Sequence, residues 1–194
     1  MMTDAQRMTD AFTIAMERAR ELRDEFGIVG YGVVELRDPR DRLKLVRPFA
    51  NLITNQGDTY YANMGIALVQ PQNNAAPTLV AKMKLGTGTT GANKAAGTNE
   101  VIQTYITGSV VSFDATFPQK TTPSANSGAL AIYKTTWVAG VATNAAITEA
   151  TITSSAADAQ GAASDTISRV TFTAVPKGAL DTLAITWNHK FLGA

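Results

Sequence analysis

The strongest constraint on the fold is a series of short β-type segments in the second half of the chain. From residue 78 onward, runs rich in β-branched and aromatic residues alternate with loops rich in Gly, Ala, Thr, Ser and Asn. Short strands separated by such turn signals pair in antiparallel sheets. We therefore expect a mainly β fold, an antiparallel β-sandwich or jelly-roll-like domain, with strands over residues 78–85, 100–107, 109–116, 129–138, 146–153, 166–175 and 180–190.

Alternation within the last two segments indicates that each strand buries one face. Leu183, Ile185 and Trp187 alternate with smaller or polar residues, and Thr171 and Thr173 alternate with apolar neighbours. A strand with this pattern faces the core on one side and solvent or a partner on the other. The predicted core is the apolar set Val80, Met83, Leu85, Phe113, Ile132, Trp137, Ile147, Ile152, Val170, Phe172, Leu183, Ile185 and Trp187.

Charged side chains are concentrated at the beginning of the chain. The first 50 residues hold 18 of the 33 charged side chains, and the rest of the chain is rich in Thr, Ala, Gly and Val. We therefore expect two regions: a charged N-terminal region over 1–50, used for attachment or packing, and a β-rich domain over 51–194.

Residues 4–26 are predicted to form an amphipathic helix. Thr3 or Asp4 can cap its first turn, and Gly27 is suited to its end. Apolar residues recur at spacings of three and four, which gives one apolar stripe of Met8, Phe12, Ala15, Ala19, Leu22 and Phe26. Two roles stay open: the helix covers a face of its own β domain, or it extends from the domain and docks on a neighbouring subunit.

Two further elements are expected between the helix and the β-rich domain. Residues 28–49 are predicted to form a hairpin or a pair of extended arms around the turn at 38–41. A short helix over 59–67 is expected after Asp58, which can cap it.

Residue types exclude most catalytic and metal-binding chemistry. The chain has no cysteine and one histidine, so a thiolate or His-rich metal site and a Ser-His-Asp triad are not expected. Glu35, Asp38 and Asp41 do not form a calcium site in this interpretation, because arginines interleave with them. We expect a protein that is not an enzyme, with no catalytic, cofactor-binding or metal-binding residues, and with His189 at a surface or an interface.

One glycine-rich segment matches a nucleotide-binding pattern. Residues 86–91 read Gly-Thr-Gly-Thr-Thr-Gly, but neither a helix nor the acidic residue of a dinucleotide site follows. We interpret the segment as a loop.

Net charge and the distribution of apolar residues limit the classes of partner that we expect. A net charge of +1 does not favour nucleic-acid binding, and no apolar run reaches the length of a membrane span. We therefore expect a soluble protein made in a cytoplasm, with neither nucleic acid nor membrane as its partner.

Four stretches of the chain form an ordered set of motifs: Asn51–Gly57 (NLITNQG), Met83–Thr89 (MKLGTGT), Ala146–Ala150 (AITEA) and Lys177–Trp187 (KGALDTLAITW). In this order they resemble β-rich structural proteins of tailed-bacteriophage virions, which serve in capsid decoration and in tail fibres. The resemblance covers about residues 51–190 and implies a virion protein made in the bacterial host.

The resemblance implies a structural role with two placements. One is a capsid decoration (cement) protein that binds the major capsid protein; the other is a tail or tail-fibre-associated protein, which could bind a host-surface carbohydrate. In either placement a homo-oligomer, such as a trimer, and other virion subunits are the expected partners. Candidate partner-contact residues are Phe12, Leu22, Phe26, Arg37, Arg40, Arg42 and Arg47. A carbohydrate-binding module and an enzyme are the competing classes, and the aromatic residues argue against the first because Trp137 and Trp187 lie inside predicted strands.

Overall fold

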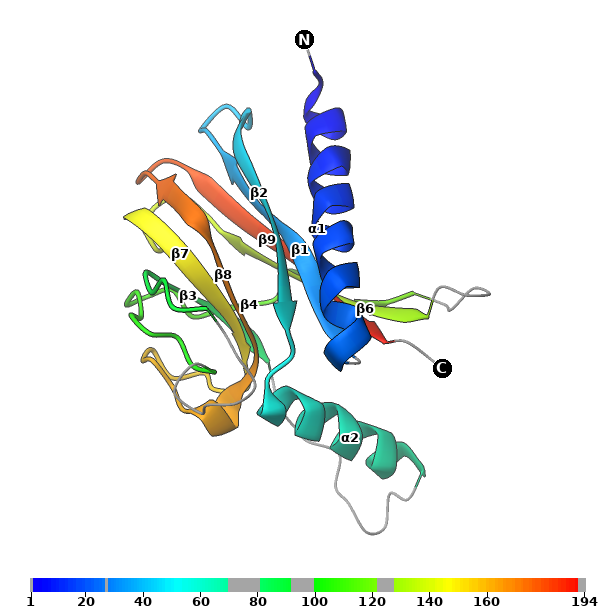
Figure 1. Cartoon of the computed structure of the whole chain (residues 1–194). Helices are drawn as coiled ribbons and strands as arrows, with labels where there is room; N and C mark the ends of the chain where they lie inside the picture. The colour runs from blue at the N-terminus through cyan, green and yellow to red at the C-terminus, as the bar shows by residue number, and fades with distance from the viewer. Residues whose placement is uncertain (1, 27, 70–80, 92–99, 122–127, 192–194) are drawn as a thin grey trace.

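The structure is a computed structural model that describes residues 2–26, 28–69, 81–91, 100–121 and 128–191. Two antiparallel sheets pack face to face as a sandwich, so the expected mainly β fold is confirmed. An N-terminal helix, α1 (Asp4–Phe26), lies on the outer face of one sheet, and a second helix, α2 (Asn55–Val69), lies at one end of the sandwich (Figure 1).

One sheet has five strands and the other has four. The five-stranded sheet has the order β2 (Leu43–Leu52), β1 (Val29–Arg37), β9 (Thr182–Phe191), β6 (Ala129–Trp137) and β5 (Gln119–Lys120). The four-stranded sheet has the order β4 (Val111–Ser112), β3 (Lys82–Gly86), β7 (Asn144–Thr153) and β8 (Thr166–Lys177), and a 3-10 turn over Ala163–Asp165 precedes β8.

The long strands lie close to their predicted positions, and the short ones do not. The strands expected at 129–138, 146–153, 166–175 and 180–190 correspond to β6, β7, β8 and β9. The strand expected at 100–107 is wrong, because Tyr105 forms only an isolated bridge with Gly86. Of the strand expected at 109–116, only the two residues of β4 form a strand. Strand β5 lies in a segment that was expected to be a loop. The second helix begins at Asn55, four residues before its predicted start.

The core lies between the two sheets and is centred on two tryptophans. Trp137 and Trp187 are completely buried, and Phe49 packs edge-on against Trp187 with ring centroids 5.1 Å apart. The predicted core is confirmed at Met83, Leu85, Trp137, Ile147, Ile152, Val170, Leu183, Ile185 and Trp187. Phe113 and Phe172 are half-buried and pack against this core, Ile132 is half-buried, and Val80 lies outside the described residues.

Helix α1 packs on its own sheet, which is the first of the two roles left open by the sequence. Over residues 4–19, where side-chain burial is described, the buried residues of α1 are alanines, and Ala15 and Ala19 contact Val29 and Tyr31 of β1. Small side chains let the helix backbone approach the sheet closely, and the half-buried Phe12 packs at the side of this contact. A second, smaller apolar cluster therefore lies outside the sandwich and fixes α1 to it.

Residues 28–49 form the hairpin β1–β2 rather than extended arms. Strand β1 pairs with β2 on one side and with β9 on the other, so it lies inside the five-stranded sheet. Its residues Val33, Val34 and Leu36 are completely or almost completely buried. The change in charge density near residue 50 falls within β2, and removal of residues 1–50 would therefore remove two strands of the sandwich.

Candidate functional site

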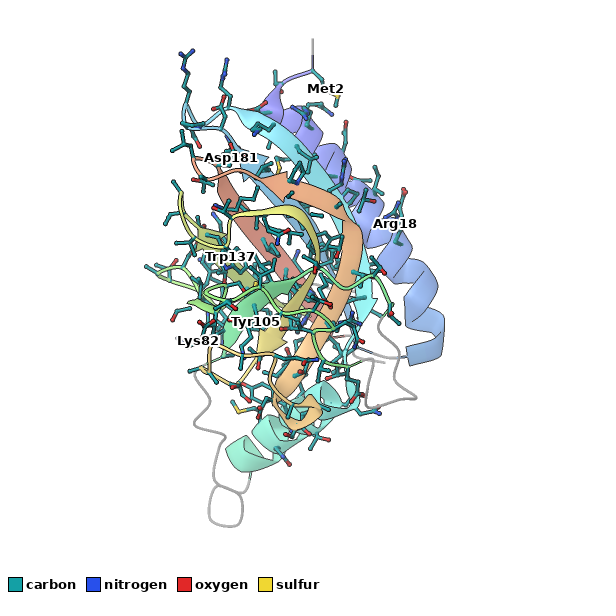
Figure 2. The ribbon with its side chains drawn as sticks, turned by 90° about the vertical axis from the view of Figure 1, so that its left-hand side faces the viewer. Met2, Arg18, Lys82, Tyr105, Trp137 and Asp181 are labelled. Carbon is teal, nitrogen blue, oxygen red and sulfur yellow. The ribbon has the colours of Figure 1, made fainter. Side chains whose placement is uncertain are left out.

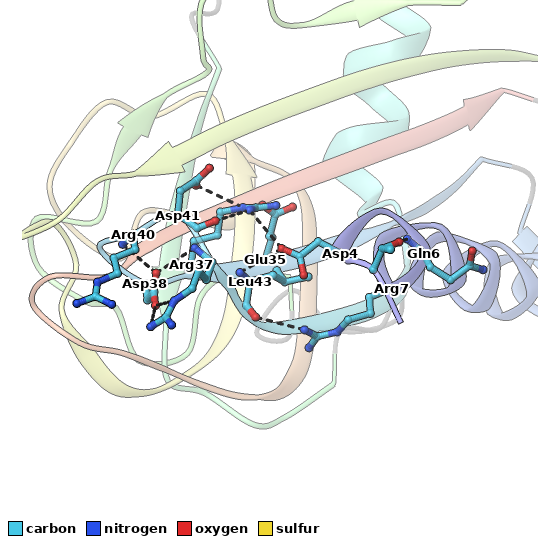
Figure 3. Close-up of polar contacts among 11 residues, drawn as sticks. Asp4, Gln6, Arg7, Glu35, Arg37, Asp38, Arg40, Asp41 and Leu43 are labelled. Atoms are coloured by element: carbon cyan, nitrogen blue, oxygen red, sulfur yellow. Dashed lines mark hydrogen bonds and ion pairs between the residues drawn. The ribbon is translucent and has the colours of Figure 1, made fainter. Parts of the chain in front are cut away.

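The basic turn between β1 and β2 is partly used to hold α1. Figure 3 shows Arg37 between Glu35, with which it makes a charged hydrogen bond, and Asp4 of α1, 3.8 Å away. Arg7 of α1 donates a 3.2 Å hydrogen bond to the Leu43 carbonyl oxygen. The hydrogen bond from Arg37 to Glu35 raises the pKa of the guanidinium. Arg37, one of the candidate partner-contact residues, connects the turn to the start of the helix.

The other two arginines of this turn face solvent. Arg40 is exposed, and Arg42 pairs with Asp38 at 2.6 Å while 71% of its side chain stays accessible. Hydrogen bonds from the backbone and side chain of Arg42 lower the pKa of the Asp38 carboxyl. Asp38 thereby shapes the turn by accepting from two backbone N–H groups, and Arg40 and Arg42 are the predicted contact residues that the fold presents outward.

The remaining candidate contact residues are scattered. Arg47 lies on β2, and its buried Nε has no hydrogen-bond partner among the described residues. Phe12 belongs to α1 and is half-buried against the small apolar cluster between α1 and the sheet. Leu22 and Phe26 belong to the last turns of α1, and their side chains lie outside the described residues. The structure therefore brings together Arg37, Arg40 and Arg42 and separates the others from them.

The glycine-rich segment holds a buried carboxylate. Glu149 of β7 is completely buried and accepts hydrogen bonds from the backbone N–H groups of Gly88, Gln103 and Thr104 at 2.7–3.1 Å. A Cβ at Gly86 or Gly88 would come within 2.4 or 2.6 Å of a Glu149 oxygen, so both positions require glycine. Residues 87–91 form a loop as expected, whereas Gly86 is the last residue of β3. Gly86 and Gly88 leave room for the Glu149 side chain.

Arg169 of β8 completes this buried cluster. Its guanidinium donates to Glu149 Oε2 through Nε at 3.0 Å and Nη2 at 2.7 Å, and neither side chain is exposed. A buried ion pair with its hydrogen bonds satisfied is tolerated, whereas loss of one partner leaves an uncompensated charge. The cluster thus fixes the four-stranded sheet to the loops beside it.

His189 is completely buried, so its predicted place at a surface or an interface is wrong. It shares the inner face of β9 with Trp187, and its Nδ1 is hydrogen bonded to the Tyr61 hydroxyl of α2. The Tyr61 hydroxyl also lies 2.8 Å from the Tyr133 hydroxyl of β6, and the His189 Nε2 atom has no partner among the described residues. This aromatic cluster fills the end of the sandwich where α2 lies.

Burial sets the protonation states in the aromatic cluster. Desolvation lowers the pKa of His189 to about 3, so the imidazole is neutral at physiological pH. Burial likewise raises the pKa of Tyr133 to about 12 and that of Tyr61 well above its ordinary value. The cluster is therefore uncharged, and it attaches α2 through neutral hydrogen bonds and ring contacts.

A groove of about 470 Å³ opens at one edge of the sandwich, where β2 and β8 diverge beneath α1. Its lining comprises Arg18, Pro48, Phe49, Ala50, Thr89, Thr171, Phe172 and Thr173. Arg18 is the charged member, and it makes no ion pair within the part of the chain that the structure describes. Arg18 is not among the residues predicted to form a site, because nothing in the sequence shows which strand edge a helix will overhang.

The described part of the chain holds neither a cluster of metal-binding side chains nor a helix suited to span a membrane. Within the described ranges, no three His, Asp or Glu side chains gather closely enough to hold a metal ion. Neither helix, as far as it is described, has a stretch that is both long and apolar enough to cross a bilayer.

Comparison with known proteins adds no relative. No protein-family model, no curated protein and no solved structure matches this chain.

Proposed function

We propose that this chain is a non-enzymatic structural protein of a tailed-bacteriophage virion, and specifically a capsid decoration protein that stabilises the head by binding the major capsid protein. The proposal starts from the four ordered stretches that resemble virion proteins. The observation that carries it is how these stretches meet in the fold.

The stretches lie far apart in the sequence and bond to one another in pairs. Asn51, in the first stretch, accepts a 2.9 Å hydrogen bond from the indole N–H of Trp187, in the fourth. Gly88, in the second, donates to Glu149, in the third. All four side chains or backbone groups are buried. The residues that carry the resemblance therefore hold the fold together through buried hydrogen bonds. This supports a structural role in which partners contact the outer surface.

The outer surface offers two places for a capsid contact. The first is the turn that presents Arg40 and Arg42, which suits an acidic patch on a shell protein. The second is α1, where Ile14 and Met16 lie on opposite flanks of the packed alanine face and are 42% and 49% exposed. Apolar side chains exposed on a helix whose other face is already packed are available to a neighbouring subunit.

The alternative placement is in the tail, where the protein would occur in few copies. A decoration protein covers the lattice of the head and so occurs in many symmetry-related copies. The amount of this chain relative to the major capsid protein in purified particles separates the two placements.

Binding to undecorated particles tests the capsid contact itself. The purified full-length protein should bind heads that lack it and raise their resistance to heat or chelation. The variant Arg40→Glu should bind more weakly, because it reverses charge at an exposed position without touching the fold. Lys120→Glu, an equal charge change on the exposed strand β5, is the matched control and should bind normally.

A further inference from the structure

The groove beneath α1 lies where the two sheets separate. The edge strands β2 and β8 meet at Ile53 and Ser168, where the Thr54 N–H donates to the Ile167 carbonyl at 3.3 Å. Beyond this bridge the two edges diverge, and residues 48–50 and 171–173 form opposite walls of the groove. Arg18 of α1 lies beside this edge in the side view of the molecule (Figure 2).

Neither wall is suited to pairing with an added peptide strand. Pro48 has no backbone N–H, so β2 lacks a donor in the middle of its wall. On β8, the register passes from Val175 opposite Ile147 to Thr171 opposite Glu149, so residues 172–174 bulge opposite Thr148. A bulge interrupts the ladder and redirects side chains. The groove therefore favours a compact ligand held by side chains over an extended strand.

The side chains of the groove combine three kinds of contact. Thr89, Thr171 and Thr173 supply hydroxyl groups that both donate and accept hydrogen bonds. Phe172 is half-buried and, with Phe49 at a centroid distance of 6.3 Å, supplies an aromatic surface. Arg18 supplies a guanidinium, which binds carboxylates through two parallel hydrogen bonds.

Two of the three threonines, Thr89 and Thr171, are positioned by the buried cluster behind them. Thr89 follows Gly88, whose N–H donates to Glu149 and whose carbonyl accepts from Thr148 at 2.8 Å. Thr171 is paired with Glu149 in the β7–β8 ladder. Groups held in place before binding lose little entropy when a ligand arrives.

We propose that the groove binds a sugar acid, that is, a monosaccharide unit carrying a carboxylate. The carboxylate pairs with Arg18, the sugar hydroxyls bond to the threonines, and the apolar face of the ring packs on Phe172. The volume of about 470 Å³ lies within the ordinary range for small-ligand pockets and exceeds what one such unit needs. This binding activity goes beyond the proposed structural role and does not depend on it.

Calorimetric or NMR titration of the full-length protein with defined sugars tests the proposal. Glucuronic acid and N-acetylneuraminic acid should each bind saturably, and glucose should bind about tenfold more weakly because it leaves Arg18 unpaired. Arg18→Ala should weaken sugar-acid binding about tenfold, and Arg18→Lys should restore part of it. Thr171→Val, which keeps the shape and removes a hydroxyl, should weaken binding of acidic and neutral sugars alike.

The matched control is Arg40→Ala, which removes an exposed arginine at the far turn and should leave sugar binding unchanged. The proposal is overturned if neither sugar acid binds, if Arg18→Ala binds them as well as the original protein, or if glucose binds as tightly as glucuronic acid. It is also overturned if a hexaglutamate peptide binds through Arg18 as tightly as the sugar acids, since the ligand would then be an acidic protein segment. Binding to capsids is measured separately, so either result leaves the structural role to its own test.

Discussion

The Trp187 indole nitrogen donates a 2.9 Å hydrogen bond to the side-chain oxygen of Asn51, joining β9 to β2 across 136 residues of sequence. Asn51 in turn donates to the Ser168 hydroxyl of β8 at 2.6 Å. One buried asparagine thus connects the two sheets at the edge where they come together. The pair also joins segment 51–57 to segment 177–187, which lie far apart in the sequence.

Replacing Trp187 should therefore destabilise the whole sandwich. Trp187→Ala removes a completely buried indole and leaves Asn51 with an unsatisfied oxygen, and we expect a loss of about 3–5 kcal/mol in the free energy of unfolding. Urea denaturation measures it. Leu180→Ala is the control, because that leucine is 69% exposed and its loss should change little. An unchanged urea midpoint for the tryptophan variant would contradict its place in the core.

Breaking the buried ion pair should lower the free energy of unfolding about as much as Trp187→Ala, although the change in the side chain is smaller. Glu149→Gln keeps the shape of the side chain and leaves the Arg169 guanidinium without its carboxylate, and we expect a cost of about 3–5 kcal/mol. Asp41→Asn, at a carboxylate that is 87% exposed, should cost almost nothing. Thermal or chemical unfolding of the two variants gives the comparison, and equal stabilities would show that the pair is not buried.

Replacement by alanine should affect the free energy of unfolding differently at two glycines of the same segment. At Gly88 a new Cβ would lie 2.5 Å from the Cβ of Gln103 and 2.6 Å from a Glu149 oxygen, so Gly88→Ala should cost about 1–3 kcal/mol or more. At Gly91 no atom lies within 4 Å of the added Cβ, so Gly91→Ala should leave the unfolding free energy unchanged or slightly higher. Equal effects at both positions would rule out the packing of this loop on Glu149.

Much of this architecture is visible in the sequence, and its exceptions have local causes. In β6 and β9 buried residues alternate with less buried ones, as the sequence pattern indicates, and in β9 His189 follows Trp187 on the inner face. Burial does not alternate in β8, where Thr166–Val170 are all buried and residues 171–174 are not, so the alternation read there from Thr171 and Thr173 is wrong. The segment 100–107 has a strand-like sequence, but its N–H groups at Gln103 and Thr104 donate to the Glu149 carboxylate instead of to a strand. Only the fold shows that a distant side chain satisfies these donors.

The early start of α2 has a comparable explanation. The segment Asn55-Gln56-Gly57-Asp58 has the composition of a turn, but the Thr54 hydroxyl accepts from the Gly57 N–H at 2.9 Å and so caps the helix. Gly57 is required because a Cβ there would lie 2.1 Å from the Ile167 carbonyl oxygen of β8. The glycine therefore serves close packing, which composition alone does not distinguish from a turn.

The candidate site was less predictable than the fold, because Arg37 pairs with Asp4 only after α1 packs on the hairpin.

Stability should fall in mild acid because His189 is buried and neutral. Its pKa in the folded protein is about 3, below the ordinary value of 6.5, so the unfolded chain binds a proton that the folded protein does not. Stability is therefore complete above about pH 6.5 and declines as the pH falls toward 3, by on the order of 4–5 kcal/mol. Asp38 and Asp181, whose pKa values are lowered by hydrogen bonds, add their losses only as the carboxyls protonate at the acid end of this range.

Unfolding free energies measured between pH 7 and pH 4 test this account. His189→Gln should be less stable at pH 7, because the ring contacts with Tyr61 and Tyr133 are lost, but its stability should hardly change down to pH 5. A slope that persists in this variant would assign the acid sensitivity to another group.

The proposal that this chain is a head decoration protein is tested most directly by its copy number in purified particles of a phage whose genome encodes it. Quantitative gel or mass-spectrometric measurement should find it in an amount comparable with that of the major capsid protein, because a decoration protein repeats across the head lattice. A few copies per particle would contradict the head placement and favour the tail. Absence from the particles would contradict a virion role altogether.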